Sequence, residues 1–138
     1  MTNQLVGVGA ITLFVADSNR SKAFYEKVFR ARLLNEDEAS VVFDFGNTMI
    51  NLLEMPYAEE LVTPGVVSGP IPGARSMLSI WVDDVDEVCR DLARAGVTLL
   101  NGPIDRDWGK RTASFTDPDG TIWEVAQDLP QGAPTESI

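Results

Sequence analysis

The stretch from Arg111 to Val125 constrains the fold more than any other part of this chain. It holds two runs rich in Thr, Phe, Ile, Trp and Val, which flank Asp-Pro-Asp-Gly at residues 117–120. Proline presets the backbone angle that opens a turn, and glycine accepts an angle that other residues resist. The stretch therefore predicts a β-hairpin, whose second strand carries one carboxylate, Glu124, among apolar neighbours. A glutamate in such a strand faces solvent, finds a hydrogen-bond donor or binds a ligand.

Length, charge and hydropathy limit the classes of partner. The 138 residues suit one domain or two small halves that share a core. The net charge of −10 argues against nucleic acid and anionic membranes as partners, because both are polyanions. No apolar run approaches the ~20 residues that a membrane span needs, and no basic-then-apolar signal opens the sequence. We therefore expect a cytoplasmic protein.

The first half of the chain reads as a strand, a helix and three further strands. Residues 9–16 have the composition of a strand, and residues 21–29 place apolar side chains at helical spacing after Asp17 or Ser18, either of which can cap a helix. Strands are then expected near residues 31–35, 40–45 and 48–54.

The second half repeats this order. Residues 76–82 read as a strand, and Asp84 with Glu87 suits the capping box of a helix. A strand at 97–100, a loop at 101–110 and the hairpin complete the half. Between the halves, residues 56–75 hold four prolines and three glycines and read as a linker or long loop. The residues from 129 to 138 read as a loose tail.

Residues around the two predicted helix starts also repeat. Val15-Ala16-Asp17 matches Val82-Asp83-Asp84, an offset of 67 residues from Val15 to Val82. In addition, the pattern Arg…Phe-x-Asp-Pro-Asp-Gly-x-x-x-Glu at residues 111–124 resembles the closing hairpin of the vicinal oxygen chelate superfamily. That superfamily includes glyoxalase I, bleomycin-resistance proteins and extradiol dioxygenases.

The resemblance covers about residues 7–127 and implies an α+β fold. Two βαβββ modules would form a curved, half-closed mixed sheet around a cavity, with the helices on the outside. We accordingly expect one domain over residues 1–138, with module 1 at about 7–55, the linker at 56–75 and module 2 at 76–127. Whether the modules pair within one chain or swap between two chains is left open.

In metal-using members of the superfamily, four side chains from the first and last strands of the modules point into the cavity. The resemblance places these positions at Ala10, Asn51, Met77 and Glu124, with Glu54 in place of Asn51 if the register differs. The chain has no histidine, and a catalytic divalent ion needs about three protein ligands. Alanine offers no donor atom, and a thioether suits hard cations poorly. We therefore expect no metal and no cofactor, and rescue through Asp44 or Glu54 is the alternative.

Strand alternation supplies most of the candidate binding residues, because residues two apart share a face, and the charged loop before the hairpin supplies Trp108. The candidate ligand contacts are Thr12, Phe14, Asn51, Met77, Ser79, Trp81, Trp108, Arg111 and Glu124. This mixture of aromatic, apolar and few polar groups is typical of a small-molecule pocket, although Phe and Met can equally close a core. Trp108 suits stacking on a planar ligand, or else covering a dimer interface or capping the barrel edge. Arg111 suits an anionic ligand, but pairing with Glu124 or Asp117 is favoured.

The leading hypothesis is a metal-independent protein that binds a small drug or metabolite, aromatic or cationic, similar to the bleomycin-resistance proteins. Those relatives are dimers, so a homodimer is expected. The alternative is a glyoxalase-like lyase or isomerase, or a dioxygenase-related enzyme, that uses a metal or Glu124 as general base. A third hypothesis is a structural or regulatory protein without a pocket.

Overall fold

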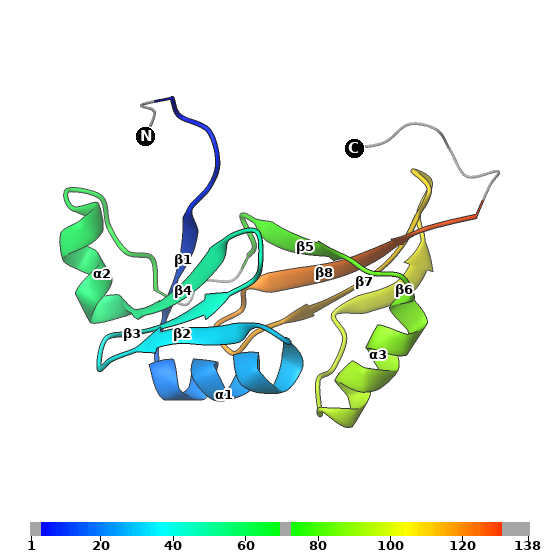
Figure 1. The fold of residues 1–138 in the computed structure, drawn as a ribbon, viewed down its shortest axis with the longest axis horizontal. Coiled ribbons are helices and arrows are strands. Elements are labelled where there is room, and N and C mark those ends of the chain that lie inside the picture. Colours follow the sequence, from blue (N-terminus) through cyan, green and yellow to red (C-terminus); the bar gives the residue numbers. More distant parts are fainter. Residues whose placement is uncertain (1–3, 70–72, 131–138) are drawn as a thin grey trace. The chain divides into compact units, whose positions relative to one another are not determined.

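The computed structural model describes residues 4–69 and 73–130, and it divides into two compact units, Met1–Gly69 and Pro70–Ile138 (Figure 1). Residues 70–72 of the predicted linker and 131–138 of the predicted tail lie outside the described residues. None of the helices in the described ranges combines the length and the hydropathy that crossing a membrane requires.

Unit 1 contains one four-stranded mixed sheet. Its elements are β1 (Ala10–Val15), α1 (Ser18–Val28), β2 (Arg32–Glu36), β3 (Ser40–Asp44), β4 (Met49–Glu54) and α2 (Met55–Val62). The strand order is β1-β4-β3-β2, in which β1 and β4 are parallel and the other pairs are antiparallel. The predicted strand, helix and three further strands are therefore confirmed.

Unit 2 repeats this arrangement. Its elements are β5 (Met77–Trp81), α3 (Val85–Arg94), β6 (Asn101–Asp105), β7 (Lys110–Thr116) and β8 (Ile122–Asp128). The strand order β5-β8-β7-β6 again begins with a parallel pair, and β7 and β8 form the predicted hairpin. The predicted α+β class and the two βαβββ modules are confirmed.

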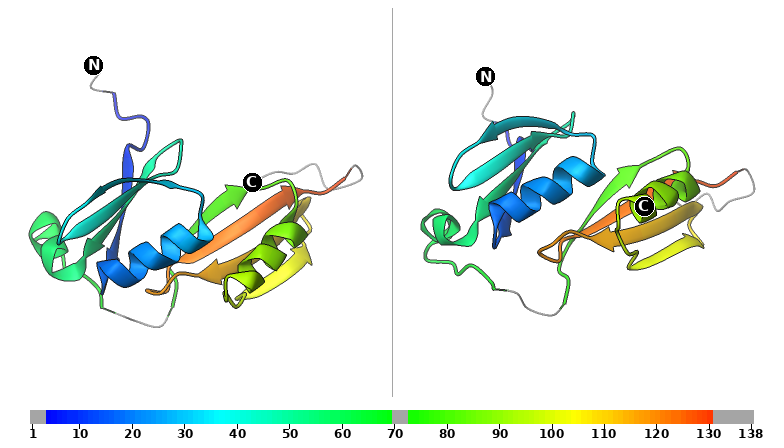
Figure 2. Two further views of the ribbon diagram at one scale, coloured as in Figure 1. Left: turned by 60° about the horizontal axis from the view of Figure 1, so that its bottom comes forward. Right: turned by 90° about the horizontal axis from the view of Figure 1, so that it is seen from below.

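Each unit has its own core between a helix and one face of its sheet. In unit 1, α1 packs on β3 and β4, and Figure 2 shows this helix along one side of the sheet from two further directions. The fully buried ring of Tyr25 stacks on Phe43 and Phe29, with centroid distances of 6.0 and 5.1 Å. In unit 2, α3 packs on β6, β7 and β8, and Phe115 and Trp123 are buried.

Two sequence predictions are wrong, and both errors involve proline. The predicted linker contains α2, because Pro56 lies in the first turn of that helix, where no backbone hydrogen bond is lost. The predicted strand at 97–100 and loop at 101–110 are replaced by β6 and a short turn. Gly102 and Pro103 suggested a loop, but β6 lies at the edge of the sheet, where proline is tolerated.

The last strand of each module also caps the helix of that module. Glu54 at the end of β4 accepts the backbone N–H of Ser18 at 2.8 Å, and Gln127 in β8 accepts that of Val85 at 2.7 Å. The predicted caps are confirmed beside them, because Asp17 accepts from two backbone N–H groups of α1 and Asp84 from that of Glu87. These bonds satisfy N–H groups that the first turn of a helix leaves without partners.

Candidate functional site on the open sheet faces

Each sheet has one face toward α1 or α3 and an opposite face, which we call the open face. In unit 2, residues of the open face that are register partners on neighbouring strands form three rows across the sheet. The rows are Met77, Ile122 and Thr116; then Ser79, Glu124, Ser114 and Asn101; then Trp81, Ala126, Thr112 and Ile104. Met77 is 49% exposed and Trp81 71% exposed, so two large side chains of this face are open to solvent.

Glu124 lies in the middle row of this face. The Ser79 hydroxyl donates a hydrogen bond to Glu124 Oε1 at 2.8 Å. The carboxylate is half-buried, and among the described residues Oε2 has no hydrogen-bond donor. One carboxylate oxygen is therefore fixed by the protein, and the other remains an acceptor for a bound molecule.

The open face of unit 1 carries a matching pair. Thr12 and Asn51 are partners in the register of β1 and β4, and Asn51 Nδ2 lies 3.4 Å from Thr12 Oγ1. Thr12 precedes Ser79 by the same 67 residues that relate Val15 to Val82. Asn51 Oδ1 is buried and has no donor among the described residues. Such an acceptor costs free energy until a donor reaches it.

The capping bonds show which residue of β4 corresponds to Glu124 of β8. Glu54 follows Asn51 by three residues, as Gln127 follows Glu124, and both later residues cap a helix. Asn51, rather than Glu54, is therefore the equivalent of Glu124. Asp44 is also engaged: its Oδ1 accepts from Gly46 N at 2.7 Å, and its Oδ2 lies 3.3 Å from Arg32 Nη2.

Comparison with known proteins agrees with this fold. Residues 7–125 match the family described as the Glyoxalase/Bleomycin resistance protein/Dioxygenase superfamily. The chain belongs to this superfamily. It is 33% identical over 125 residues to the uncharacterized protein YraH of Bacillus subtilis, which covers 86% of this chain and 96% of YraH.

Two further relatives extend the comparison. The metallothiol transferase FosB of Lysinibacillus sphaericus is 28% identical over 112 residues, which cover 80% of this chain and 74% of FosB. The crystal structure of a glyoxalase/bleomycin resistance protein/dioxygenase from Nocardioides has a TM-score of 0.83 at 20% identity, covering 99% of this chain and 93% of that one. The latter likeness shows the fold alone.

The donor set of this superfamily member does not fit a divalent metal. Ala10 has no donor atom, Met77 offers a thioether, and Asn51 and Glu124 together give one amide and one carboxylate. Glu54 and Asp44, the expected substitutes, are already engaged in a helix cap and an ion pair. Within residues 4–69 and 73–130, no three His, Cys, Asp or Glu side chains gather in a group that could hold an ion.

Arg111 lies away from Glu124. Its guanidinium contacts Asp86 of α3 at 2.9 Å and Asp105 of β6 at 2.8 Å, and both carboxylates raise the pKa of Arg111, Asp105 most. The prediction of a carboxylate partner is thus confirmed, but Glu124 and Asp117 were the wrong partners. The sequence did not show that residue 111 faces α3.

The remaining candidates divide between the units. Thr12 is exposed and Phe14 half-buried on β1 of unit 1, where Phe14 is the register partner of the buried Leu53. Trp108 lies in the β6–β7 turn of unit 2, is 36% exposed, and has the Arg106 guanidinium 5.9 Å from its ring centroid. Sequence reasoning missed Arg106, although a basic residue beside a tryptophan in a short loop was a usable signal.

Proposed function

We propose that this protein binds a small, partly aromatic molecule on its open sheet faces without a metal ion. The observation that carries the proposal is the identity of the residues at the four superfamily ligand positions. Alanine and asparagine in unit 1, and methionine and glutamate in unit 2, suit contact with a molecule better than coordination of an ion. In this proposal the protein is a cytoplasmic homodimer, as the resemblance and composition predict, and neither nucleic acid nor membrane is a partner.

The groups on the open faces suit such a ligand. Trp81 and Met77 offer exposed aromatic and thioether surface, which favours stacking and apolar contact. Glu124 Oε2 and Asn51 Oδ1 are acceptors without donors among the described residues, so each favours an N–H or O–H group on a ligand. The net charge of −10 also favours the approach of a cationic molecule.

A second candidate function is an enzyme of the glyoxalase type with Glu124 as general base. The observation that favours it is the Ser79–Glu124 hydrogen bond, which orients one carboxylate oxygen and leaves the other without a donor among the described residues. A stoichiometric metal in the purified protein, or turnover that Glu124→Gln abolishes, would support this enzyme over the binding protein.

Binding is tested with N-phenyl-1-naphthylamine, a neutral aromatic probe whose fluorescence rises in apolar surroundings. We expect Trp81→Ala to weaken its binding by about tenfold, because stacking and the buried area of the ring are both lost. The free energy of unfolding should change by no more than about 0.5 kcal/mol, since Trp81 is a surface residue at 71% exposure.

Leu61→Ala is the matched control, because Leu61 is 70% exposed on α2 and outside the proposed surface. Leu61→Ala should leave probe binding unchanged. Equal losses in the two variants, or no binding to the unmodified protein, would contradict the proposed function. Trp108→Ala should also weaken binding with the fold intact, whereas a lower melting temperature with unchanged binding would mark Trp108 as structural.

A further inference from the structure

One half-buried arginine in unit 2, Arg106, forms no ion pair with any carboxylate of the described residues. The half-buried basic residues in the described ranges are Lys22, Arg106, Lys110 and Arg111. Three of them form ion pairs, with Glu36, with Asp128, and with Asp86 and Asp105 respectively. Arg106 instead hydrogen-bonds only neutral groups among the described residues. In a chain of net charge −10, such a cation is unusual, because carboxylates are plentiful.

Neutral hydrogen bonds hold this guanidinium over the open face. Arg106 Nε donates to Thr112 Oγ1 at 3.0 Å, and Nη2 lies 3.4 Å from Asn101 Oδ1. Thr112 and Asn101 belong to two neighbouring rows of the open face, so the side chain of Arg106 reaches from the turn back across the sheet edge. A guanidinium carries five N–H groups, and these two bonds leave three of them for a ligand.

Aromatic surface adjoins the same guanidinium. Trp108 lies two residues on in the turn, with the Arg106 Cζ atom 5.9 Å from its ring centroid. We call Asn101, Arg106, Trp108 and Thr112 the Arg106 corner. Lys110, whose backbone O accepts the Arg106 N–H at 2.7 Å, has its Nζ 5.3 Å from the ring centroid of Trp81. Two cations and two exposed indoles therefore belong to the same half of this sheet face.

The acidic groups around the corner leave Arg106 available. Asp105 is engaged by Arg111, and Asp128 is engaged by Lys110. Asp107 is exposed in the turn, and Glu124 belongs to the row of Asn101, yet neither forms an ion pair with Arg106. A planar guanidinium fixed in this way matches the geometry of a carboxylate or a similar anion.

We propose that the Arg106 corner binds the anionic group of an aromatic ligand, while the ring of that ligand contacts Trp108. The proposal rests on the proposed function and narrows its ligand class from aromatic molecules in general to aromatic acids. It also replaces the expectation of a cationic ligand with that of an anionic one, because the Arg106 corner carries a positive charge although the net charge of the protein is negative.

Two probes that differ by one sulfonate test the proposal. They are 8-anilino-1-naphthalenesulfonate and its neutral counterpart N-phenyl-1-naphthylamine, titrated into the full chain. We expect Arg106→Gln to lower the affinity for the sulfonate probe by about tenfold, because a charge-assisted hydrogen bond is lost. The same variant should change the affinity for the neutral probe by less than about twofold.

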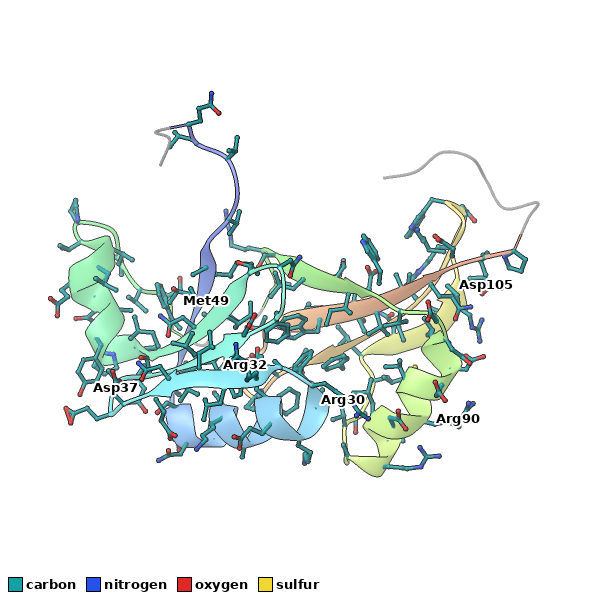
Figure 3. All side chains as sticks on the ribbon, viewed as in Figure 1. Arg30, Arg32, Asp37, Met49, Arg90 and Asp105 are labelled. Carbon is teal, nitrogen blue, oxygen red and sulfur yellow. The ribbon has the colours of Figure 1, made fainter. Side chains whose placement is uncertain are left out.

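Arg90→Gln is the matched control. Arg90 is exposed on α3 (Figure 3) and its loss changes the net charge equally, so it should alter the affinity for neither probe. Arg106→Lys keeps the charge without the planar fork and should give an intermediate loss. The melting temperature of each variant checks the fold. If Arg106→Gln melts below the assay temperature, the comparison of Arg106→Lys with Arg90→Lys decides the question.

The outcomes separate the two proposals. Equal affinity of the sulfonate probe for the unmodified protein, the Arg106 variants and the Arg90 variants would overturn the assignment of an anion site. The proposed function would still stand if the neutral probe bound. Failure of both probes to bind the unmodified protein would overturn both proposals.

Discussion

Replacing Gly102 by alanine is expected to destabilise unit 2 by about 2–5 kcal/mol. Gly102 has φ of +93°, and a Cβ built there would lie 2.5 Å from Thr112 O and 2.6 Å from Ala113 Cα. Both of these are backbone atoms of β7, an inner strand of the sheet, and cannot rotate away. The substitution therefore adds a steric clash to the cost of a positive φ.

Gly46→Ala separates these two costs. Gly46 has nearly the same φ, +94°, but a Cβ there would meet nothing within 4 Å. This control should lose only about 1–2 kcal/mol, the cost of the backbone conformation. Equal losses in the two variants would contradict the close approach of β6 to β7.

Urea unfolding followed by tryptophan fluorescence suits the Gly102 measurement, whereas the Gly46 control, which lies in unit 1, is followed by far-UV circular dichroism. All three tryptophans, Trp81, Trp108 and Trp123, belong to unit 2, so the signal reports on that unit. Because β6 carries Asn101 and leads directly to Arg106, the Gly102 variant should also lose the preference for the sulfonate probe.

Replacing Tyr25 by alanine is expected to destabilise unit 1 by about 3–5 kcal/mol. The ring is fully buried between α1 and the sheet and stacks on Phe43 and Phe29, so its removal leaves a cavity and deletes two aromatic contacts. Far-UV circular dichroism in urea follows this loss, since unit 1 contains no tryptophan.

Tyr57→Ala provides the matched substitution. Tyr57 is 40% exposed on α2 and should cost no more than about 0.5 kcal/mol when replaced. If Tyr25→Ala lowers the free energy of unfolding no more than Tyr57→Ala does, then the packing of the Tyr25 ring does not stabilise α1 on the sheet.

The elements that could be predicted are those whose signals are local. Asp17 and Asp84 cap helices through their own next residues, and the hairpin turn at residues 117–120 carries its own turn residues. The alternation of β5 and β8 also placed Ser79 and Glu124 on one face, where the structure joins them by a hydrogen bond.

The features that the sequence did not predict depend on partners far away in the chain, or on prolines that are compatible with more than one local structure. Proline at residue 56 or 103 reads as a breaker, and only the position of α2 at a helix start or of β6 at a sheet edge makes it tolerable. Arg111 was assigned the wrong partners because Asp86 is 25 residues away in the chain. The role of Glu54 in capping α1, over 36 residues, was invisible for the same reason.

The two modules share a common frame. In both, the last strand caps the helix, through Glu54 or Gln127, and a hydroxyl group, from Thr12 or Ser79, lies beside Asn51 or Glu124. Of the four positions that the resemblance assigns to metal ligands, Glu124 alone carries a carboxylate. What remains on each open face is a set of acceptors and apolar surface.

We propose that the positions at which metal-using relatives hold an ion coordinate none in this protein, and calorimetric titration of the metal-free protein measures this. Ni²⁺, Zn²⁺ and Mn²⁺ would each be titrated into the unmodified protein and into Glu124→Gln. We predict no saturable binding with a Kd below about 1 µM, and identical isotherms for the two proteins. Saturation at one ion per chain, abolished by Glu124→Gln, would contradict the account.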